Sequence, residues 1–320
     1  MKKILIVRFS SIGDIVLTTP VIRCCKLQLE QTEIHFVCKE SFRDLLEHNP
    51  YISKLHCFKT DIGEILPALK AEKYDLMIDL HRNLRSLRLK TLLRVKSISF
   101  NKLNLRKLAA VNFKQVSLLP AVHIVDRYLD TCKSLGVHND GKGLDYFISE
   151  QDKALPQGRS LPPRFIALVI GGSYFTKKIP LHKLLEIADK STLPLVLLGG
   201  REDKDIADQI GIKFPGVLNL CATLSLNQSA YVVSLAEWVI TSDTGMMHIA
   251  AAYKKKIISV WGNTIPEFGM GPYLPTKENR ILEIRGLPCR PCSKLGFGKC
   301  PKGHFKCMNQ IDFTFLRELH

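Results

Sequence analysis

The chain has 320 residues, of which 46% are hydrophobic and 24% are charged. This composition is that of a globular protein with a sizeable core, and the length suggests about two domains. No apolar run approaches the roughly 20 residues that cross a bilayer. The apolar run near the start is short and is interrupted by Arg8, so a secretory signal is not expected either and a cytoplasmic location is predicted.

The charge balance is strongly basic. There are 46 Lys and Arg residues against 30 Asp and Glu, a formal net charge of +16. Such an excess favours an anionic partner: a nucleic acid, a membrane surface or a phosphorylated substrate. No Asp or Glu occurs in residues 80–125, whose basic residues are Arg82, Arg85, Arg88, Lys90, Arg94, Lys96, Lys102, Arg106, Lys107 and Lys114. We expect these residues to form one basic surface.

The first predicted elements are a strand over residues 3–7, a loop over 8–14 and a helix that continues to Leu27. The loop lacks the three glycines of a dinucleotide fingerprint and the Gly-Lys-Ser/Thr of a P-loop. It does place one carboxylate, Asp14, at the mouth of the strand. An aspartate here is consistent with a simple helix cap as well as with a catalytic group.

Strands and helices then alternate, which predicts an α/β fold with a doubly wound parallel sheet. The segments are strands 34–38, 54–58, 74–80 and 144–148, and helices 42–47, 62–71 and 122–135. After residue 80 a helix carries Arg82, Arg85 and Arg88 on roughly one side, while Leu84, Leu87 and Leu92 are expected to face the core.

The basic helix can be interpreted in three ways. A solvated face is the ordinary role of a charge run, but ordinary surfaces mix both signs. Nucleic acid is disfavoured because there is little aromatic interleaving and no recognition motif. An anionic lipid headgroup or a phosphorylated glycolipid fits better.

A linker over residues 150–164 separates the halves, and the second half resumes the alternation. Its strand 164–170 ends in Gly171-Gly172-Ser173, where backbone amides can approach a phosphate, with Lys177 or Lys178 as a following charge. A strand at 195–198 precedes Gly199-Gly200. The triplet Asp203-Lys204-Asp205 has the form of a metal-binding DxD, but acids are ordinary in a first helical turn.

Residues 236–262 predict a strand from Trp238, a helix over 246–253 and a strand over 257–261. Ser242, Asp243 and Thr244 are helix-capping types, and a helix that begins at the carboxyl end of a strand suits a phosphate. The alternative is a plain helix cap with a core histidine at His248.

Six of the ten cysteines are scattered through apolar segments and are expected to be small core residues. The other four are Cys289, Cys292, Cys300 and Cys307, with His304 between them. The spacing is compatible with a structural zinc site, with iron–sulfur as a further possibility, or with a cluster of free thiols.

Two segments, VRFSSIGDIVLTTPVIR and SDTGMMHIAAA followed by Gly262-Asn263-Thr264, resemble the heptosyltransferases of glycosyltransferase family 9. The resemblance runs in family order through nearly the whole chain. It implies a GT-B fold: an acceptor domain over 1–155, a nucleotide-sugar domain over 156–308, and a helix over 309–320 that packs back on the first domain. It implies inverting, metal-independent transfer of a heptose from ADP-heptose to the lipopolysaccharide inner core. The cysteine segment, which resembles a family segment not regarded as a metal centre, favours the heptosyltransferase II type.

The resemblance also implies residue roles. Asp14 is the expected base, and Lys177 is expected to contact the donor diphosphate. Donor binding is expected of Gly172, Ser173, Lys177, Glu202, Asp243, Thr244, Gly245 and His248, the last as a direct contact or as support for the loop. Acceptor binding is expected of Arg8, Ser11, Gly13, His81, Arg82, Arg85 and Arg88.

The expected partners are a nucleotide sugar, an anionic lipopolysaccharide core and the cytoplasmic face of the inner membrane, contacted through residues 82–114. Nucleic acid is not expected, and a monomer is. Two alternatives stay open: a family-9 transferase that uses another nucleotide sugar, and a non-catalytic scaffold that binds anions or membranes.

Overall fold

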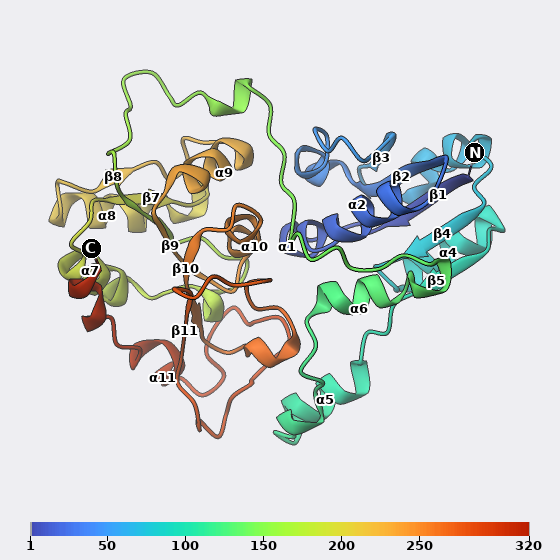
Figure 1. The fold of residues 1–320 in the computed structure, drawn as a ribbon. Coiled ribbons are helices and arrows are strands. Elements are labelled where there is room, and N and C mark those ends of the chain that lie inside the picture. The colour runs from blue at the N-terminus through green and yellow to red at the C-terminus, as the bar shows by residue number, and fades with distance from the viewer. Residues whose placement is uncertain (1, 320) are drawn as a thin grey trace. The chain divides into compact units, whose positions relative to one another are not determined.

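The computed structural model describes residues 2–319, which divide into two compact units (Figure 1). Unit 1 contains residues 2–102 and Val122–Ser149, and unit 2 contains Leu103–Ala121 and 150–319. The expected boundary at 155/156 therefore falls at 149/150, and a segment from the middle of the first half joins the second unit.

Unit 1 is built on a parallel sheet with the strand order β3-β2-β1-β4-β5. Its strands are β1 (Lys2–Val7), β2 (Thr32–Lys39), β3 (Lys54–Phe58), β4 (Leu76–Asp79) and β5 (Ser97–Ser99). The chain reverses its direction of winding between β1 and β4, where Val7 pairs in register with Asp79. In open parallel sheets this switch point, at the carboxyl ends of the strands, is the usual binding position.

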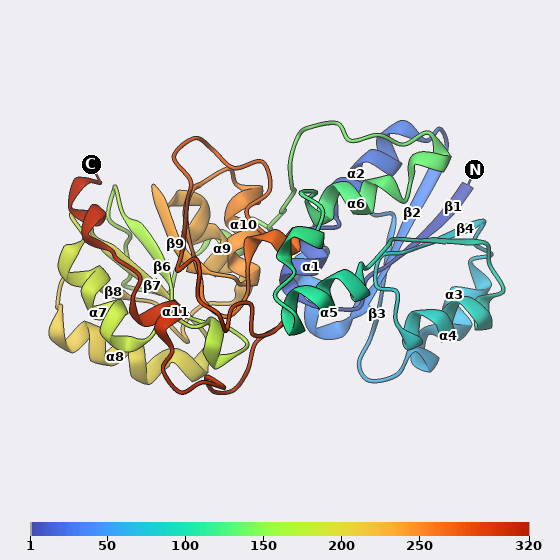
Figure 2. The same ribbon diagram turned by 90° about the horizontal axis from the view of Figure 1, so that it is seen from below.

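Helices cover both faces of this sheet: α2 and α6 on one and α3 and α4 on the other (Figure 2). The helices of unit 1 are α1 (Ile12–Val16), α2 (Thr19–Gln28), α3 (Leu66–Ala71), α4 (Leu84–Leu93) and α6 (Ile124–Asp130), with 3-10 turns at Glu40–Leu45, Ile62–Ile65 and Lys133–Leu135. The apolar alternation predicted most of them. The orientation predicted for α4 is wrong at two positions, because Leu84 and Leu87 are exposed while Ser86 and Leu89 are buried.

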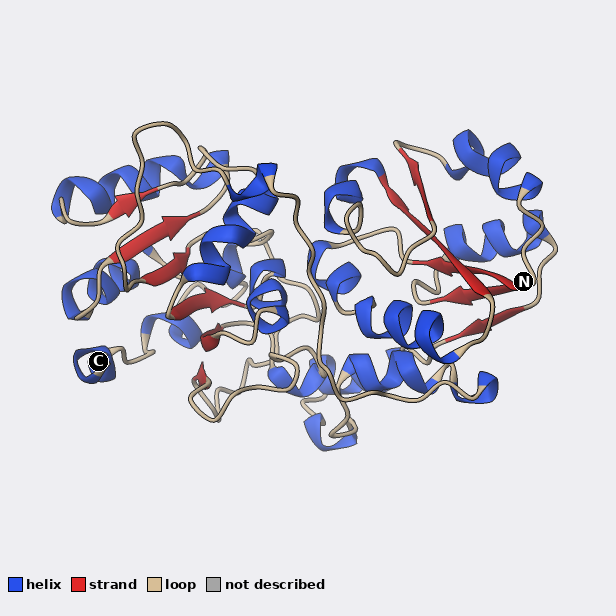
Figure 3. Ribbon diagram, turned by 45° about the horizontal axis from the view of Figure 1, so that its top comes forward, coloured by secondary structure: helices blue, strands red, loops and turns tan. Residues whose placement is uncertain are grey.

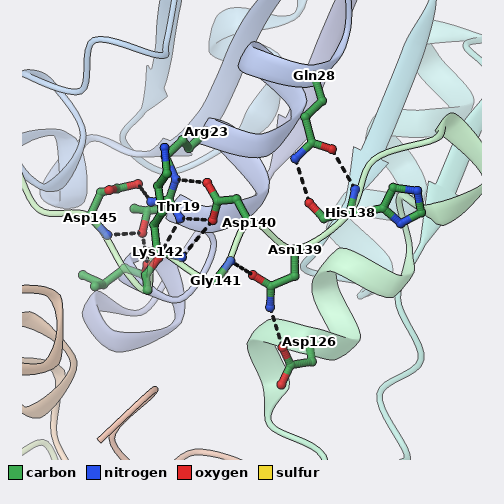
Figure 4. Close-up of polar contacts among 12 residues, drawn as sticks. Thr19, Arg23, Gln28, Asp126, His138, Asn139, Asp140, Gly141, Lys142 and Asp145 are labelled. Atoms are coloured by element: carbon green, nitrogen blue, oxygen red, sulfur yellow. Dashed lines mark hydrogen bonds and ion pairs between the residues drawn. The ribbon is translucent and has the colours of Figure 1, made fainter. Parts of the chain in front are cut away.

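The predicted strand at 144–148 is absent, and this part of the chain runs extended across α2 without joining the sheet. Buried Arg23 of α2 holds it: the guanidinium forms two 2.8 Å hydrogen bonds to Asp140, contacts Asp145, and donates to the Gly143 carbonyl at 2.9 Å (Figure 4). Thr19 accepts from the Asp145 amide at 2.9 Å. Side chains thus replace strand pairing here.

Unit 2 contains a six-stranded parallel sheet with the order β11-β10-β9-β6-β7-β8. Its strands are β6 (Ile166–Val169), β7 (Leu195–Leu198), β8 (Leu218–Asn219), β9 (Trp238–Ser242), β10 (Lys256–Trp261) and β11 (Arg280–Glu283). The switch point lies between β6 and β9, where Val169 pairs with Thr241. Figure 3 shows helices flanking the strands of each sheet.

The helices of unit 2 are α5 (Asn104–Asn112), α7 (Leu181–Lys190), α8 (Lys204–Lys213), α9 (Leu226–Leu235), α10 (Gly245–Ala252) and α11 (Lys306–Asn309). The last turn, a 3-10 helix over Thr314–Glu318, belongs to unit 2. Its Leu316 and the neighbouring Phe313 are buried in the same core as Ile187 of α7. The end of the chain was expected to pack on the first domain; its apolar side chains lie instead in the core of the second unit.

Within residues 2–319, no helix is both long enough and apolar enough to cross a membrane. The acid-free segment is divided between the two units, because Arg82–Lys102 belongs to unit 1 while Arg106, Lys107 and Lys114 belong to unit 2. It is therefore not a single surface of one domain.

Candidate functional site

Most of the predicted site residues cluster at the two switch points. In unit 1 they follow β1 and β4, and in unit 2 they follow β6 and β9. We call these groups the unit 1 site and the unit 2 site and describe each by itself.

The unit 1 site is centred on an ion pair between Arg8 and Asp14, whose Nη2 and Oδ2 atoms are 2.7 Å apart. Arg8 is buried directly after β1, where it also donates to the carbonyls of Ser10 (2.7 Å) and Leu80 (2.8 Å) and to the Tyr128 hydroxyl (3.2 Å). These contacts fix the guanidinium, so Arg8 acts as a rigid support for the carboxylate.

Asp14 occupies the third position of α1, and Ser11 caps this helix. Ser11 donates to Asp14 Oδ2 from its hydroxyl at 2.9 Å and from its amide at 3.4 Å. Both hydrogen bonds and the ion pair of the carboxylate use Oδ2; among residues 2–319, no hydrogen bond or ion pair reaches Oδ1. Asp14 is therefore both a capping residue and a carboxylate with one oxygen available, on a side chain that is 25% exposed.

The electrostatics keep Asp14 ionised. Burial alone would raise its pKa, but the charge of Arg8 and the hydrogen bonds from Ser11 outweigh burial and lower it below the usual range. At neutral pH the group is therefore a carboxylate that can accept a proton.

The end of β4 carries Asp79, whose Oδ1 accepts from the amides of His81 (2.9 Å) and Arg82 (2.7 Å). Its Oδ2 accepts from Ser86 at 2.7 Å, which fixes the start of α4. The His81 ring packs against Phe9 with centroids 4.9 Å apart. Burial, together with the charge of Arg8, lowers the pKa of His81 to about 3, so the ring is neutral at pH 7. Its buried Nδ1 has no hydrogen-bond partner among the described residues.

The arginines expected to bind the acceptor differ in their surroundings. Arg82 donates to the Phe100 carbonyl at 2.9 Å, and the Arg85 guanidinium lies 6.0 Å from the Phe9 ring centroid. Arg88 pairs with Asp61 at 2.9 Å on an exposed surface. It lies about one helical turn after Arg85, further along α4 from the end of β4. Arg82 and Arg85 therefore belong to the unit 1 site more closely than Arg88 does.

Sequence reasoning assigned no role in the site to Lys102 or Tyr128. Lys102 experiences the charges of Arg8, Asp79 and Asp14, and burial lowers its pKa. Tyr128 contacts Arg8 from α6. Only the fold brings these residues to β1. Among the other predicted residues, Gly13 is buried within α1 and Ser11 is exposed beside Asp14.

The unit 2 site joins the ends of β6 and β9. Lys177 Nζ lies 2.7 Å from Asp243 Oδ2, and that oxygen also accepts from the Thr264 hydroxyl at 2.8 Å. Gly172 lies beside Thr244, because a Cβ added to it would be 3.6 Å from the Thr244 methyl group. The predicted donor residues from two distant segments thus meet.

The adjacent lysine has a different environment. Lys178 pairs with Asp203 at 2.6 Å, and Asp203, which is 1% exposed, also accepts from the Gly200 amide at 2.9 Å. Lys178 therefore holds a buried carboxylate, while Lys177 is directed to the β9 loop. These contacts give Asp203, the first residue of the Asp203-Lys204-Asp205 triplet, a structural role.

Helix α10 begins at Gly245 with Thr244 as its cap, so the amides of its first turn lie at the end of β9. His248 is buried one turn later. Ser173 and Glu202 are exposed, and the Glu202 carboxylate lies directly over Gly200, where it leaves no room for a side chain. Free helix amides beside Lys177 form a suitable environment for a phosphate.

The segment that follows β10 is tied to this site by Arg290, which sequence reasoning did not select. Its Nε donates to the Gly262 carbonyl at 2.6 Å, and its Nη2 donates to the Thr264 carbonyl and to Glu283, both at 2.8 Å. Asn263 lies in the sequence between the residues that carry those carbonyls. Within residues 2–319, neither the nitrogen nor the oxygen of its buried side chain has a hydrogen-bond partner.

The four C-terminal cysteines are free thiols. The Sγ of Cys289 lies 3.9 Å from His304 Nε2, and the Cys292 thiol donates to the Cys289 carbonyl at 2.9 Å. Burial raises the pKa of Cys292 to about 12 and that of Cys307 to about 11, so both are protonated at neutral pH. In the described part of the chain, no three of these cysteines and His304 bring their ligand atoms within 4.8 Å of one another. This arrangement does not fit a closed zinc or iron–sulfur site.

The one described group that meets this spacing is His35, His56 and Glu72 in unit 1. Its carboxylate is already paired with Lys3 (2.8 Å) and Lys54 (2.6 Å). The Tyr74 hydroxyl bonds both histidines, at 2.9 and 3.0 Å. These partners account for the cluster as a buried polar network.

Comparisons with known proteins give the family and the fold of the chain. The family model for glycosyltransferase family 9 (heptosyltransferase) matches residues 62–296. Lipopolysaccharide heptosyltransferase 1 of Campylobacter coli is 24% identical over 88% of this chain and 89% of its own. Lipopolysaccharide heptosyltransferase 2 of Salmonella typhimurium strain LT2 is 22% identical over 99% and 97%. The E. coli heptosyltransferase WaaC, solved with ADP-2-deoxy-2-fluoro heptose, aligns with a TM-score of 0.67 and 22% identity, covering 89% of this chain and 94% of that one.

The chain belongs to glycosyltransferase family 9 and has the GT-B fold. It is a glycosyltransferase.

Proposed function

We propose that this protein is an inverting heptosyltransferase that moves a heptose from ADP-heptose to the inner core of lipopolysaccharide. The observation that carries the proposal is the Asp14 carboxylate: Oδ2 is held by Arg8 and Ser11, while Oδ1 has no hydrogen bond or ion pair within the described residues. The family and the solved relative with a fluorinated ADP-heptose support the donor.

In this mechanism Asp14 Oδ1 takes the proton of the acceptor hydroxyl. The hydroxyl oxygen attacks the anomeric carbon of the donor while the bond from that carbon to the diphosphate breaks. The configuration at the anomeric carbon is therefore inverted. ADP leaves with the electron pair of the broken bond, and the proton remains on Asp14. Arg8 keeps the carboxylate ionised before the attack.

The unit 2 site supplies the donor contacts. Lys177 and the first amides of α10 would stabilise the negative charge that grows on the departing diphosphate. Asp243 orients Lys177, and exposed Glu202 is proposed to contact the ribose. With these cationic and amide donors, the proposed reaction is metal-independent.

The acceptor side is proposed at the unit 1 site, where His81 and Arg82 are bound to Asp79 at the end of β4 and Arg85 lies near Phe9. A phosphorylated sugar core matches these cations. We place the monomeric enzyme at the cytoplasmic face of the inner membrane, where such an acceptor would be reached. The cysteine segment favours the second heptosyl transfer, although relatives named heptosyltransferase 1 and 2 match to a similar degree.

The proposal is tested by ADP release with a panel of nucleotide sugars and two acceptors, a heptose-free core and a core that carries one heptose. It predicts turnover with ADP-heptose, transfer to the mono-heptosylated core, and an inverted anomeric configuration by NMR. Turnover with another nucleotide sugar and none with ADP-heptose would overturn the assignment of ADP-heptose as the donor. Tight binding of ADP-heptose without turnover on either acceptor would identify a non-catalytic scaffold.

A further inference from the structure

The second unit carries a cluster of exposed apolar side chains on α5 and on the 3-10 turn that follows it (Val116–Leu118). We call it the α5 patch, and its members are Leu105 (82% exposed), Leu108 (47%), Phe113 (72%) and Leu118 (48%). Figure 1 shows α5 apart from the six-stranded sheet of its unit. Large apolar side chains gathered on one short segment usually mark an interaction surface.

Other residues of the same segment are already packed. Ala110 is buried against Ile265 and Phe268, with Val116 and Leu119 packed around them. The segment is therefore held to unit 2 by these apolar side chains, and the members of the α5 patch are not part of that core.

Polar contacts fix the segment as well. Lys114 Nζ donates to the carbonyls of Val111 (2.7 Å) and Pro291 (2.8 Å), and Lys107 Nζ lies 5.8 Å from the Phe268 ring centroid. A fixed helix presents its exposed leucines in one arrangement, so little ordering is required when they are buried.

The charges around the α5 patch distinguish between the partners that could cover it: a membrane, a second copy of the chain or a nucleic acid. Residues 80–125 contain no acidic residue, and Arg106 is exposed between Leu105 and Leu108. Apolar side chains among cations are typical of segments that lie in the interface of an anionic bilayer. A second copy of this basic protein would bring like charges together, and a nucleic acid would leave the leucines without an apolar partner.

We propose that the α5 patch inserts into the headgroup and acyl boundary of an anionic membrane. The choice of a membrane rests on the proposed function, since lipopolysaccharide is a lipid. The inference goes beyond electrostatic attachment, because it assigns the contact to apolar residues of unit 2 in addition to the arginines of unit 1.

The test is flotation of the full-length protein with vesicles of phosphatidylglycerol and phosphatidylethanolamine. The double variant Leu105→Gln/Phe113→Gln is compared with Ile212→Gln, a matched control on α8 whose side chain is 81% exposed. We expect the double variant to lose about tenfold or more in vesicle binding, and the control to stay near wild type.

Insertion itself is measured with Phe113→Trp and brominated lipids, which quench only a tryptophan that enters the bilayer. The proposal predicts quenching beyond that of the wild type, whose Trp238 and Trp261 are buried. It also predicts residual binding at about 0.5 M NaCl, where exposed charges are largely screened. Equal binding of the two glutamine variants, or complete release by salt, would overturn insertion; a stable dimer covering the patch would do the same.

Failure of the proposed function gives a different result. With a deacylated, water-soluble acceptor, the Leu105→Gln/Phe113→Gln variant should retain wild-type turnover, because neither residue belongs to the sites described above. If the wild type has no turnover but still floats with vesicles, the proposed heptosyl transfer fails while the membrane contact stands.

Discussion

At the scale of residues, the surroundings of Asp14 are compatible with both roles that the sequence left open, a helix cap and the proposed base. It accepts hydrogen bonds from its helix cap, Ser11, and it keeps one oxygen available at the mouth of β1. Its position was predictable because strand, loop and helix are contiguous there. Lys102 and Tyr128 were not, because only the parallel register and the docking of α6 bring them to β1.

Replacing Arg8 should change the pH dependence of the reaction. Since Arg8 lowers the pKa of Asp14, removing its charge raises that pKa, and the base becomes protonated at a higher pH. We expect the acid limb of kcat/KM to move upward by about one pH unit in Arg8→Gln. Arg8→Lys, which keeps the charge, should move it less; an unchanged limb in a folded Arg8→Gln protein would contradict this.

The neighbouring lysines should separate catalysis from stability. Lys177→Ala should lower kcat by about 10²-fold or more, because the proposed diphosphate loses its cation. It should cost less stability than Lys178→Ala, because Asp243, which it leaves unpaired, is 11% exposed whereas Asp203 is 1% exposed. Lys178→Ala should instead lower stability by about 2–3 kcal/mol, less than a fully buried pair because Lys178 is 22% exposed. Thermal unfolding and steady-state kinetics on both variants check this. If Lys178→Ala lost activity and Lys177→Ala lost more stability, Lys178 would be the diphosphate ligand and Lys177 the structural residue.

At the scale of elements, the sequence was informative wherever apolar runs alternate with turn residues, and both parallel sheets follow from that alternation. The prediction of a strand was wrong where side-chain hydrogen bonds take the place of backbone pairing. Residues 144–148 have the apolar character of a strand, but Arg23 holds them against α2. The helix α4 was predicted correctly, but the side that faces the core was not. Leu84 is as apolar as a core residue and is nevertheless exposed, so the sequence alone could not identify the buried side.

The end of β10 provides a stability test at this scale. A Cβ on Gly262 would be 2.7 Å from the Thr176 carbonyl oxygen, a backbone atom with little freedom to move. We expect Gly262→Ala to destabilise by about 1–3 kcal/mol in urea unfolding. Gly211 of α8 has nothing within 4 Å of its Cβ position, so Gly211→Ala should be neutral or stabilising. Equal stabilities for the two variants would refute the close approach.

At the scale of the whole molecule, the two-unit division was predictable from the restart of the alternation after the linker. The assignment of Leu103–Ala121 to unit 2 was not, because it depends on Ala110 packing with Ile265 and Phe268, far along the chain. Net charge indicated an anionic partner, but it could not reveal that apolar side chains are exposed beside the cations.

Nucleotide binding should be a property of unit 2. We expect ADP alone to slow amide exchange in residues 171–178 and 242–248, because the phosphates would order the two loops that Lys177 and Asp243 connect. Direct protection should be absent at residues 8–14. Hydrogen exchange followed by mass spectrometry measures both, and protection confined to unit 1 would move the donor to the other site.

The central claim is that Asp14 is the base of a metal-independent transfer. The direct measurement is acceptor-dependent ADP release from ADP-heptose in EDTA, for the wild type and Asp14→Asn, with ADP-heptose binding measured alongside. We predict turnover by the wild type that survives EDTA, and a loss of about 10²-fold or more in the variant at unchanged donor affinity. Wild-type turnover that EDTA abolishes, or a folded Asp14→Asn variant with near-wild-type turnover, would contradict the claim.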